Sequence, residues 1–387
     1  MSRLFITGAT GFLGGELAVA LSKLDSIEKM FCLIRARNDE DAVARLKQVF
    51  ALHGDYFNSE KVVPVRADLA DPELASQIAA NDELRDINVV IHCAANTSFL
   101  QRKTPAIMET NIGGTQRLLE WASRLRNLQT FAYVGTATIA GAGPDVVGKT
   151  IYEDDSPHPD SKHLVGYTQS KMLAEMAVAN AIPADKLLIF RPSILLGDSR
   201  CIVPRSFDIA WIIVAFRYLR LCFCDPDSEC DVIPVDYAAK AIVSLLTSRR
   251  RHSTYHVSGG PAATTPRKIG KLIDYYDPNL PDVTFCPREH LDLVKRWLRT
   301  GENLTSELRP YSDHLEHIKA TVGRKNARML LAGLDAYWQF IDLNQRFDNS
   351  RMLADSQIGL PEPAHVYLKR TAPYLHDIDP LQAAVNP

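Results

Sequence analysis

The sequence predicts an α/β fold: a doubly wound parallel sheet with a smaller, mostly helical C-terminal substrate domain. Over roughly residues 1–200, short β-branched runs alternate with segments of helical period, the pattern of a parallel sheet covered by helices on both faces. A Gly-rich turn directly follows the first of these runs. Beyond Pro192 the alternation ends, and after about Thr284 the pattern is mostly helical.

The individual elements follow from composition and period. Runs rich in Val, Ile, Leu and aromatic residues predict strands over Leu4–Thr7, Met30–Ile34, Val62–Arg66, Val89–His92, Thr130–Val134 and Leu187–Phe190. Apolar residues at helical spacing predict helices over Leu13–Leu24, Asp39–His53, Pro72–Asn81, Ile112–Arg126 and Gln169–Asn180.

Composition excludes several classes of protein. The 387 residues are 46% hydrophobic and 23% charged, which is typical of a globular protein and excludes a disordered chain. The net charge of −2 provides no overall basic field, so we expect no nucleic-acid partner. No apolar stretch approaches the ~18 residues of a membrane span. Seven irregularly spaced cysteines and an N-terminus unlike a signal peptide predict a cytoplasmic protein, and the cysteines lack the paired spacing of a zinc site.

The turn after the first strand has the spacing G-x-x-G-x-x-G. Glycines there permit a tight turn and let backbone N–H groups approach a pyrophosphate, which the helix N-terminus also attracts. Between a strand and a helix, this motif is typical of a Rossmann dinucleotide-binding fold. We expect cofactor contacts from Thr7, Gly8, Thr10, Gly11, Phe12, Leu13 and Gly14.

The ends of the next strands indicate which dinucleotide binds. A fold that prefers NAD ends its second strand with an acidic residue, whereas here Arg35 follows the strand. A guanidinium suits a 2′-phosphate, so we expect NADPH, with Arg45 as a second candidate. Along the sheet edge, further cofactor contacts are expected from Asp68 and Leu69 beside the adenine and from the small residues Cys93, Ala94 and Ala95.

Tyr167 and Lys171 are four residues apart and share one face if the segment is helical. A phenol with a pKa of ~10 is a poor acid, and an adjacent ammonium is expected to lower that pKa toward the range of general acid catalysis. After the fifth strand, Thr136 can present a hydroxyl that donates to a carbonyl oxygen gaining negative charge. We expect these three residues to be catalytic and prefer Thr136 to Thr138.

Together these motifs resemble the extended short-chain dehydrogenase/reductases over about the first 200 residues. The likeness rests on Thr7–Gly14, Asp68-Leu69, His92–Ala95, Asn111 with Gly114-Thr115, Thr136, Tyr167/Lys171 and Arg191–Ser193. A more specific likeness, to the thioester reductase and fatty acyl-CoA reductase branch, rests on Gly11–Gly14, Cys32–Ala36, Ala44–Leu46, Ile233–Asp236 and Phe347–Ser350. The branch usually has Ser-Thr after the fifth strand, and Gly135 replaces that serine here.

The resemblance implies hydride transfer from NADPH to an acyl thioester, carried by CoA or by an acyl or peptidyl carrier protein. The product would be an aldehyde or, after a second hydride, an alcohol. Thr136 and Tyr167 would donate to the carbonyl oxygen, and Lys171 would hold the nicotinamide ribose. Asn111 would hold a relay water, and Pro192 and Ser193 would line the nicotinamide pocket.

The implied domains are an NADP-binding Rossmann domain over residues 1–200, with a contribution from 231–260, and a mainly helical substrate-binding region over 201–387. Two other functions stay open. One is an epimerase, dehydratase or hydroxyl dehydrogenase acting on a sugar nucleotide or sterol-like alcohol, and Arg35 argues against the epimerase. The other is a non-catalytic NADP-binding regulator, against which the Tyr167/Lys171 pair argues. Acyl chain and oligomeric state stay open too.

Overall fold

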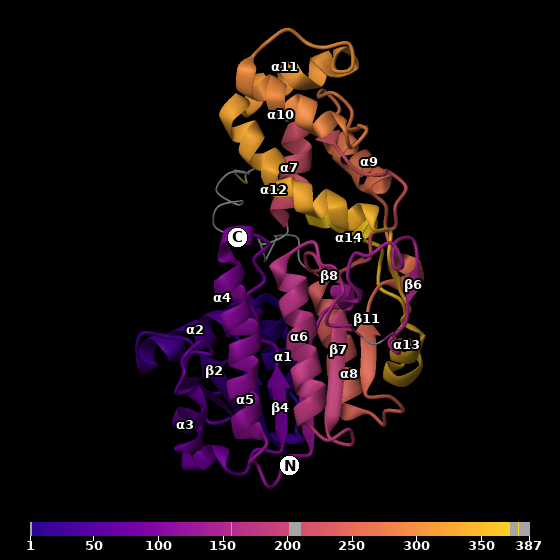
Figure 1. Ribbon diagram of the computed structural model, residues 1–387. Coiled ribbons are helices and arrows are strands. Elements are labelled where there is room, and N and C mark those ends of the chain that lie inside the picture. The colour runs from indigo at the N-terminus through magenta and orange to yellow at the C-terminus, as the bar shows by residue number, and fades with distance from the viewer. Residues whose placement is uncertain (1, 156, 201–209, 372–377, 379–387) are drawn as a thin grey trace.

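The computed structural model describes residues 2–155, 157–200, 210–371 and 378. Its centre is a seven-stranded, all-parallel sheet with the order β11-β7-β5-β4-β1-β2-β3 (Figure 1). The strands are β1 (Ser2–Thr7), β2 (Ile27–Ile34), β3 (Val62–Arg66), β4 (Val89–His92), β5 (Thr130–Val134), β7 (Leu187–Pro192) and β11 (Thr254–Val257). Strand order reverses between β1 and β4, and such a switch point is where open α/β sheets bind ligands.

The predicted fold class is confirmed, and all six predicted strands are present. β2 begins earlier than predicted, at Ile27, and β7 continues to Pro192. The seventh strand, β11, lies beside β7 at the edge of the sheet and was not predicted as a strand. Its four residues are too few to show a period, and it pairs with a segment distant in the sequence.

Helices cover both faces of the sheet. Those on one face are α1 (Phe12–Ser22), α2 (Asp39–Leu52) and α8 (Val235–Thr247), and those on the other are α3 (Leu74–Ala79), α5 (Gly114–Ala122) and α6 (Gly166–Ala181). Short α4 (Thr104–Met108) joins α5 through a π-helical turn, Glu109–Gly113. The α6 helix begins at Gly166, earlier than predicted, so Tyr167 lies in its first turn.

A second hydrophobic core belongs to the helical part of the chain. It is formed by α7 (Ala210–Leu219), α9 (Pro266–Tyr276), α10 (His290–Thr300), α11 (Ser312–Thr321), α12 (Arg324–Asp342) and α14 (Ala364–Thr371). In Figure 1 these helices lie beyond the carboxyl ends of the strands. The carboxyl edge of the sheet therefore faces the helical part, although the domain boundary at residue 200 stays a prediction.

The segment Phe347–Ser350 has a structural role at the edge of the sheet. The Asn349 amide donates to the carbonyl oxygen of Ser258 over 3.0 Å, and the ring of Phe347 packs edge-on against His256 of β11. Helix α13 (Ser350–Ser356) follows and packs against α8 and β11. This segment thus fastens the end of the helical part back onto the sheet.

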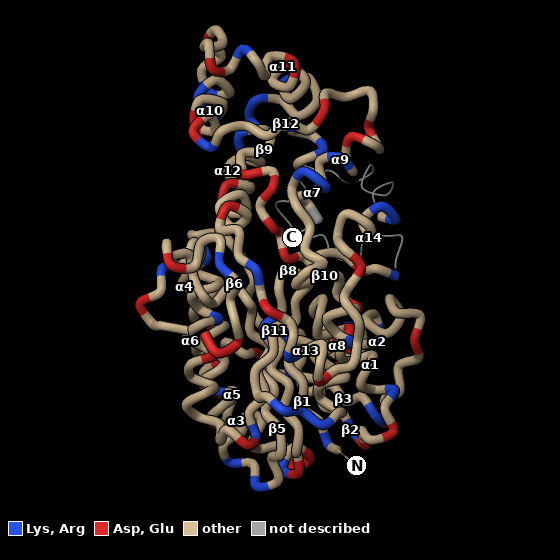
Figure 2. The backbone as a smooth tube through the Cα atoms, turned by 90° about the vertical axis from the view of Figure 1, so that its right-hand side faces the viewer, with Lys and Arg blue, Asp and Glu red and all other residues tan. Residues whose placement is uncertain are grey.

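The remaining strands are two-residue pairs: β6 (Thr150–Ile151) with β13 (Arg346–Phe347), β8 (Ile194–Leu195) with β10 (Val232–Ile233), and β9 (Leu221–Cys222) with β12 (Thr284–Phe285). Charged residues of both signs are interspersed over the sheet and helical parts (Figure 2). Within the described ranges, no helix combines the length and apolarity needed to cross a bilayer. Over the same ranges, no three His, Cys, Asp or Glu side chains form a group that could hold a metal ion.

Candidate active site

The glycine-rich turn between β1 and α1 forms a close-packed backbone cradle. Gly8 has φ +78°, and its carbonyl oxygen accepts from the Gly11 N–H over 2.8 Å. A Cβ on Gly14 would lie 2.0 Å from that same oxygen, so only glycine allows this approach. Gly11 precedes α1 without a side-chain cap, which leaves the first N–H groups of the helix for a ligand. This arrangement fits a pyrophosphate at a helix N-terminus.

The Thr7 side chain forms hydrogen bonds within the protein. Its buried hydroxyl lies 2.8 Å from Nδ1 of His92 and accepts from the Ala94 N–H over 3.1 Å. Nε2 of His92 in turn lies 2.8 Å from the Thr115 hydroxyl. Burial, with a smaller effect of Lys171, lowers the pKa of His92 to about 3. These neutral contacts join the carboxyl ends of β1 and β4, so Thr7 shapes the cradle from beneath.

The remaining predicted residues of the turn differ in exposure. Thr10, Gly11 and Phe12 stay accessible, whereas Leu13 and Gly14 are buried against the sheet. Ala94 packs directly on the turn, since a Cβ on Gly8 would lie 2.7 Å from its nitrogen. Cys93, Ala94 and Ala95 are all half-buried at the end of β4. The structure therefore brings the β4 end and the glycine turn together.

Arg35 lies exposed after β2, and its carbonyl oxygen accepts from the Arg45 guanidinium. Among the described residues, no hydrogen bond or ion pair engages the Arg35 guanidinium. The guanidinium of neighbouring Arg37 instead contacts the Asp41 carboxylate at 3.4 Å. Arg35 and the guanidinium of Arg45 are thus adjacent at the end of β2, where a 2′-phosphate is expected.

Two predicted residues lie at the end of β3. The Asp68 carboxylate accepts from the Ala70 N–H over 3.0 Å, and Asp68 itself is half-buried. Leu69 is buried, and its carbonyl oxygen accepts from Arg117 of α5 over 3.2 Å. Their place beside the adenine stays a prediction.

Three of the four residues predicted to be catalytic, Thr136, Tyr167 and Lys171, lie near the carboxyl edge of the sheet. Lys171 is 3% exposed, and its ammonium donates to the carbonyl oxygen of Val134 over 2.6 Å. The hydroxyl of Thr136 lies 3.0 Å from that of Thr138 and donates to the carbonyl oxygen of Pro192 over 3.4 Å. Half-buried Tyr167 lies one turn before Lys171 on α6. Hydroxyl, phenol and ammonium groups therefore lie around the ends of β5 and β7.

The pKa values at this edge differ from expectation in one respect. The pKa of Tyr167 is raised above its ordinary range by burial, with Cys93 adding to the effect, whereas the spacing predicted a lowered pKa. The reason is that Lys171 directs its ammonium to the Val134 carbonyl and over the Tyr133 ring, 4.3 Å from its centre. Burial lowers the pKa of Lys171 to about 8, against opposing effects of Cys93 and Glu175. Tyr167 therefore stays protonated as a donor.

Asn111 lies in the π-helical turn and is 2% exposed. Its amide nitrogen donates to the Asn96 carbonyl over 3.0 Å and to the Ser170 hydroxyl over 2.8 Å, and its side-chain oxygen accepts from the Asn96 N–H. Both amide hydrogens are therefore used by the protein. Asn111 joins the loop after β4 to the catalytic helix, and a relay water on its remaining lone pair stays a prediction.

The position of Ser193 is fixed by the sheet. It is buried directly after β7, and its N–H donates to the carbonyl oxygen of Val257 over 3.0 Å. With Pro192, which Thr136 contacts, it continues the carboxyl edge toward β11. Whether the two residues line a nicotinamide stays a prediction.

Sequence reasoning missed Phe99, an aromatic residue beside Tyr167. Phe99, in the loop after β4, stacks on the Tyr167 ring at 5.9 Å between centroids and on Tyr337 of α12 at 4.8 Å. Phe340 lies against Phe99, and Trp211 of α7 against Tyr337. No sequence signal marks Phe99, since its partners come from helices far along the chain. The stack connects the catalytic helix with the helical part.

A buried ion pair between α6 and β7 was also missed. Nε and Nη2 of Arg191 donate to Oε1 of Glu175 over 3.0 and 2.7 Å, and both side chains are almost fully buried. Glu175 comes four residues after Lys171, so the helical spacing that relates Tyr167 to Lys171 could have identified it.

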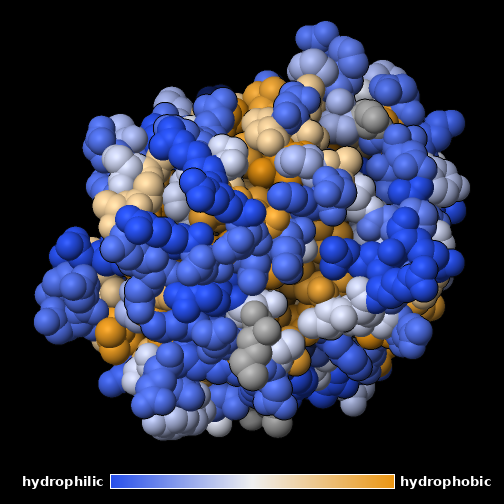
Figure 3. Space-filling view, turned by 90° about the horizontal axis from the view of Figure 1, so that it is seen from below, coloured by the Kyte–Doolittle hydropathy of each residue, from blue (hydrophilic) through white to orange (hydrophobic). Residues whose placement is uncertain are grey.

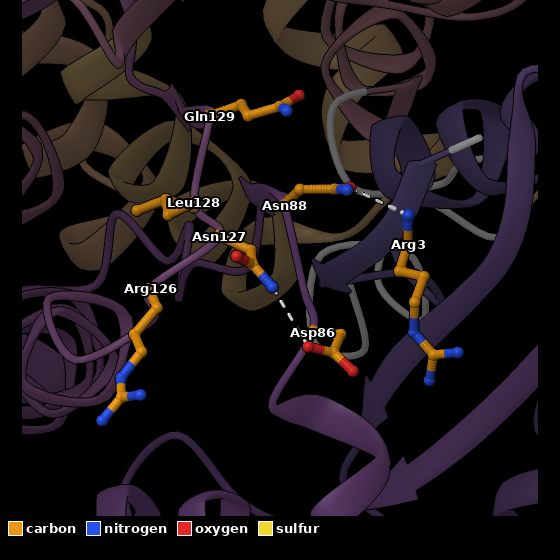
Figure 4. Close-up of a pocket in the computed structure, with 7 residues that line it drawn as sticks. All are labelled: Arg3, Asp86, Asn88, Arg126, Asn127, Leu128 and Gln129. Atoms are coloured by element: carbon orange, nitrogen blue, oxygen red, sulfur yellow. Dashed lines mark hydrogen bonds between the residues drawn. The ribbon is translucent and has the colours of Figure 1, made fainter.

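A cavity of ≈ 480 Å³ lies at the other edge of the sheet. Its lining residues are Arg3, Asp86, Asn88, Arg126, Asn127, Leu128 and Gln129 (Figure 4). They lie at the start of strand β1 and in the segments just before β4 and β5, which is the amino edge of the sheet. Figure 3 shows this end covered mainly by hydrophilic side chains. The cavity is therefore separate from the glycine turn and from Tyr167.

Comparison with known proteins agrees with the Rossmann fold described above. Residues 6–242 match the family described as male sterility protein, a family of NAD-binding domains. The chain is 29% identical over 260 residues to a linear gramicidin synthase of Brevibacillus parabrevis, covering 65% of this chain and 5% of that protein. It is 24% identical over 340 residues to the alcohol-forming fatty acyl-CoA reductase of Simmondsia chinensis, covering 70% of this chain and 68% of that protein.

Among solved structures, the terminal R domain from the myxalamid PKS-NRPS biosynthetic pathway matches with a TM-score of 0.71 at 22% identity, covering 97% of this chain and 90% of that one. UDP-glucuronic acid 4-epimerase from Bacillus cereus matches with a TM-score of 0.62 at 17% identity, covering 97% and 98%. Both likenesses agree with the Rossmann fold of extended short-chain dehydrogenase/reductases. The chain spans only a small part of several of the curated relatives it matches.

Proposed function

Because the chain belongs to the male sterility protein family of NAD-binding domains, we propose that it is an NADPH-dependent reductase of acyl thioesters. The observation that carries this proposal is the position of Thr136 and of the Lys171 ammonium at the carboxyl end of β5, with Tyr167 one turn before Lys171 on α6. Relatives named as a fatty acyl-CoA reductase and as a terminal R domain support it.

The cofactor is a nicotinamide dinucleotide, as in the family, and we take it to be NADPH because of Arg35. The free N–H groups at the start of α1 would hold the pyrophosphate, and Arg35 with Arg45 would hold the 2′-phosphate. When bound, this cofactor supplies a hydride for the thioester carbonyl carbon.

The residues of the chain would act on the thioester oxygen. Tyr167, which stays protonated, and Thr136 donate hydrogen bonds to this oxygen as it gains negative charge, and each such donor contributes about 10²–10³ in rate. Tyr167 then passes its proton to the oxygen, which gives a hemithioacetal. Breaking the carbon–sulfur bond with return of a proton to sulfur releases the thiol and an aldehyde. Lys171 would hold the nicotinamide ribose beside Tyr167.

The substrate carrier is proposed to be either CoA or an acyl or peptidyl carrier protein. One relative with a solved structure is a thiolation-reductase di-domain of an archaeal non-ribosomal peptide synthetase, matched at 20% identity with a TM-score of 0.69. Its name supports a carrier protein, whereas that of the Simmondsia reductase supports CoA. The two sources share the phosphopantetheine thioester.

The test is a panel of acyl-CoA and carrier-bound thioesters mixed with the protein and either NADPH or NADH. We expect loss of reduced-nicotinamide absorbance with NADPH and at least one thioester, together with an aldehyde or alcohol by mass spectrometry. If none of the thioesters causes NADPH to be oxidised, the proposal is refuted. Oxidised cofactor retained through purification would instead favour an epimerase.

A further inference from the structure

An acidic side chain of α6 lies in the protein interior. Glu175 lies one turn after Lys171 on α6 and is almost fully buried. Both Arg191 bonds go to its Oε1, while Oε2 has no hydrogen-bond partner in the described part of the chain. The carboxylate is thus paired on one oxygen only.

Gly135 leaves room for this oxygen. A Cβ at this position would lie 2.8 Å from Oε2 of Glu175, so the absent side chain gives the carboxylate oxygen its place. Gly135 directly follows Val134, whose carbonyl oxygen holds the Lys171 ammonium. The unpaired oxygen and the ammonium therefore flank the same turn at the end of β5.

We propose that Glu175 is a positioning residue that keeps Lys171 protonated through its unpaired carboxylate oxygen. Burial works against the charged form of Lys171, and a nearby negative charge offsets that effect. The pKa of Lys171 is lowered to about 8 by burial, with Glu175 among the groups that raise it. Burial raises the pKa of Glu175, and Arg191 and, more weakly, Lys171 act against that rise.

Other groups around Lys171 cannot substitute for this charge. The titratable groups facing it are His92 and Cys93 from the end of β4, Tyr133 of β5, and Tyr167 and Glu175 of α6. Burial raises the pKa of Cys93 to about 11 and also raises those of both tyrosines, while His92 stays neutral. Among these groups, Glu175 is the acid that is ion-paired with an arginine, Arg191, and this pairing favours its negatively charged form.

The proposal rests on the proposed function in one respect: both require that Lys171 holds the cofactor. Its test is the affinity for NADPH, followed by nicotinamide fluorescence from about pH 6 to pH 10 without any thioester. For the wild type we expect affinity to fall with a midpoint near pH 8, where Lys171 loses its proton. In Glu175→Gln the midpoint should move about one unit lower, because the ammonium loses its negative neighbour.

Two further variants make the result decisive. Glu175→Gln leaves Arg191 buried without its partner, so Glu175→Gln/Arg191→Met removes both charges and should show the same downward shift. Asp355→Asn is the matched control, because Asp355 is also buried and bonded to an arginine, Arg251, over 2.7 Å at the start of β11. It should lower stability and leave the midpoint in place.

A midpoint unchanged in both Glu175 variants would overturn the proposal, as would a wild-type affinity that does not fall above pH 8. Because no thioester is present, a shifted midpoint would stand even if no thioester is reduced. An unshifted midpoint in an active thioester reductase would leave the proposed function intact.

Discussion

Asn111 donates to the hydroxyl of Ser170 over 2.8 Å, and that hydroxyl donates to the carbonyl oxygen of Tyr167 over 2.7 Å. A buried amide therefore holds the first turn of the catalytic helix. Because the same amide also binds the backbone of Asn96, the loop after β4 and the helix α6 are fixed to one another through a single side chain.

Removing this amide should loosen the catalytic helix. We expect Asn111→Ala to lower the free energy of unfolding by about 1–3 kcal/mol, because it leaves buried groups unsatisfied, and to lower kcat/KM at least tenfold. Urea unfolding and thioester turnover measure the two effects. Asn349→Ala is the control: it removes another buried amide, the one bound to Ser258, and should reduce stability while leaving kcat/KM nearly unchanged. Equal losses of activity in both variants would contradict a role at Tyr167.

Substitutions of the two neighbouring glycines Gly14 and Gly15 should have different effects on cofactor binding. Gly14→Ala places a methyl group 2.0 Å from the Gly8 oxygen and should cost about 2 kcal/mol or more of stability and abolish NADPH binding. In Gly15→Ala the new methyl meets the Val49 side chain at 3.1 Å and the Ala9 carbonyl oxygen at an ordinary contact distance of 3.6 Å, so binding should persist. Fluorescence titration with NADPH compares the two. Binding by the Gly14 variant equal to wild type would contradict the cradle.

Cofactor preference should depend on Arg35. We expect Arg35→Ala to weaken NADPH binding about ten- to a hundredfold and leave NADH binding unchanged, because a charge-assisted bond to the 2′-phosphate contributes about 1.5–3 kcal/mol. Arg37→Ala is the matched control, since Arg37 is engaged with Asp41. Dissociation constants for both cofactors give the answer. A parallel loss for NADH, or the larger loss in Arg37→Ala, would show that Arg35 does not bind the phosphate.

Stability below neutral pH should depend on His92. Its folded pKa of about 3 lies below the ordinary value of 6.5, so the unfolded chain binds a proton that the folded protein excludes. Stability is therefore lost as pH falls below about 6.5, by up to about 1.4 kcal/mol per pH unit. His92→Gln removes this loss, and urea unfolding at several pH values should give a shallower slope. His256, whose pKa is also lowered to about 3, and Asp231, whose pKa is raised to about 6, are present in both proteins and cancel in the comparison. Identical slopes would contradict a neutral His92.

The sheet could be predicted because its information is local. Runs such as Thr130–Val134 are bounded by polar residues or glycine, and the turn at Gly8 needs no distant partner to be recognised. β11 was not predicted because its identity as a strand depends on pairing with β7, more than sixty residues earlier in the chain. The raised pKa of Tyr167 was not predicted for a similar reason. The spacing indicates that Lys171 is its neighbour, but it does not indicate that the ammonium points to the Val134 carbonyl.

The site residues divide in the same way. The contact of the Thr7 hydroxyl with His92, a residue of another strand, was not predicted, and a contact of Thr7 with the cofactor stays a prediction. Phe99 had no pattern of its own, and it became visible only beside Tyr167 and Tyr337. Residues whose role follows from spacing along one element were within reach of the sequence, and residues whose partners come from other elements were not.

The most direct test of the central claim follows the hydride itself. The wild-type protein and its Tyr167→Phe variant are incubated with NADPH deuterated at both positions of nicotinamide carbon 4 and with the thioesters of the panel. For the wild type, mass spectrometry should find deuterium on the former carbonyl carbon of an aldehyde or alcohol, with release of the thiol. The variant should bind NADPH with similar affinity and form this product at least about a hundredfold more slowly, because it lacks the phenol that donates to the oxygen. Thiol release with an unlabelled carboxylic acid, or labelled product formed equally fast by Tyr167→Phe, would contradict the account.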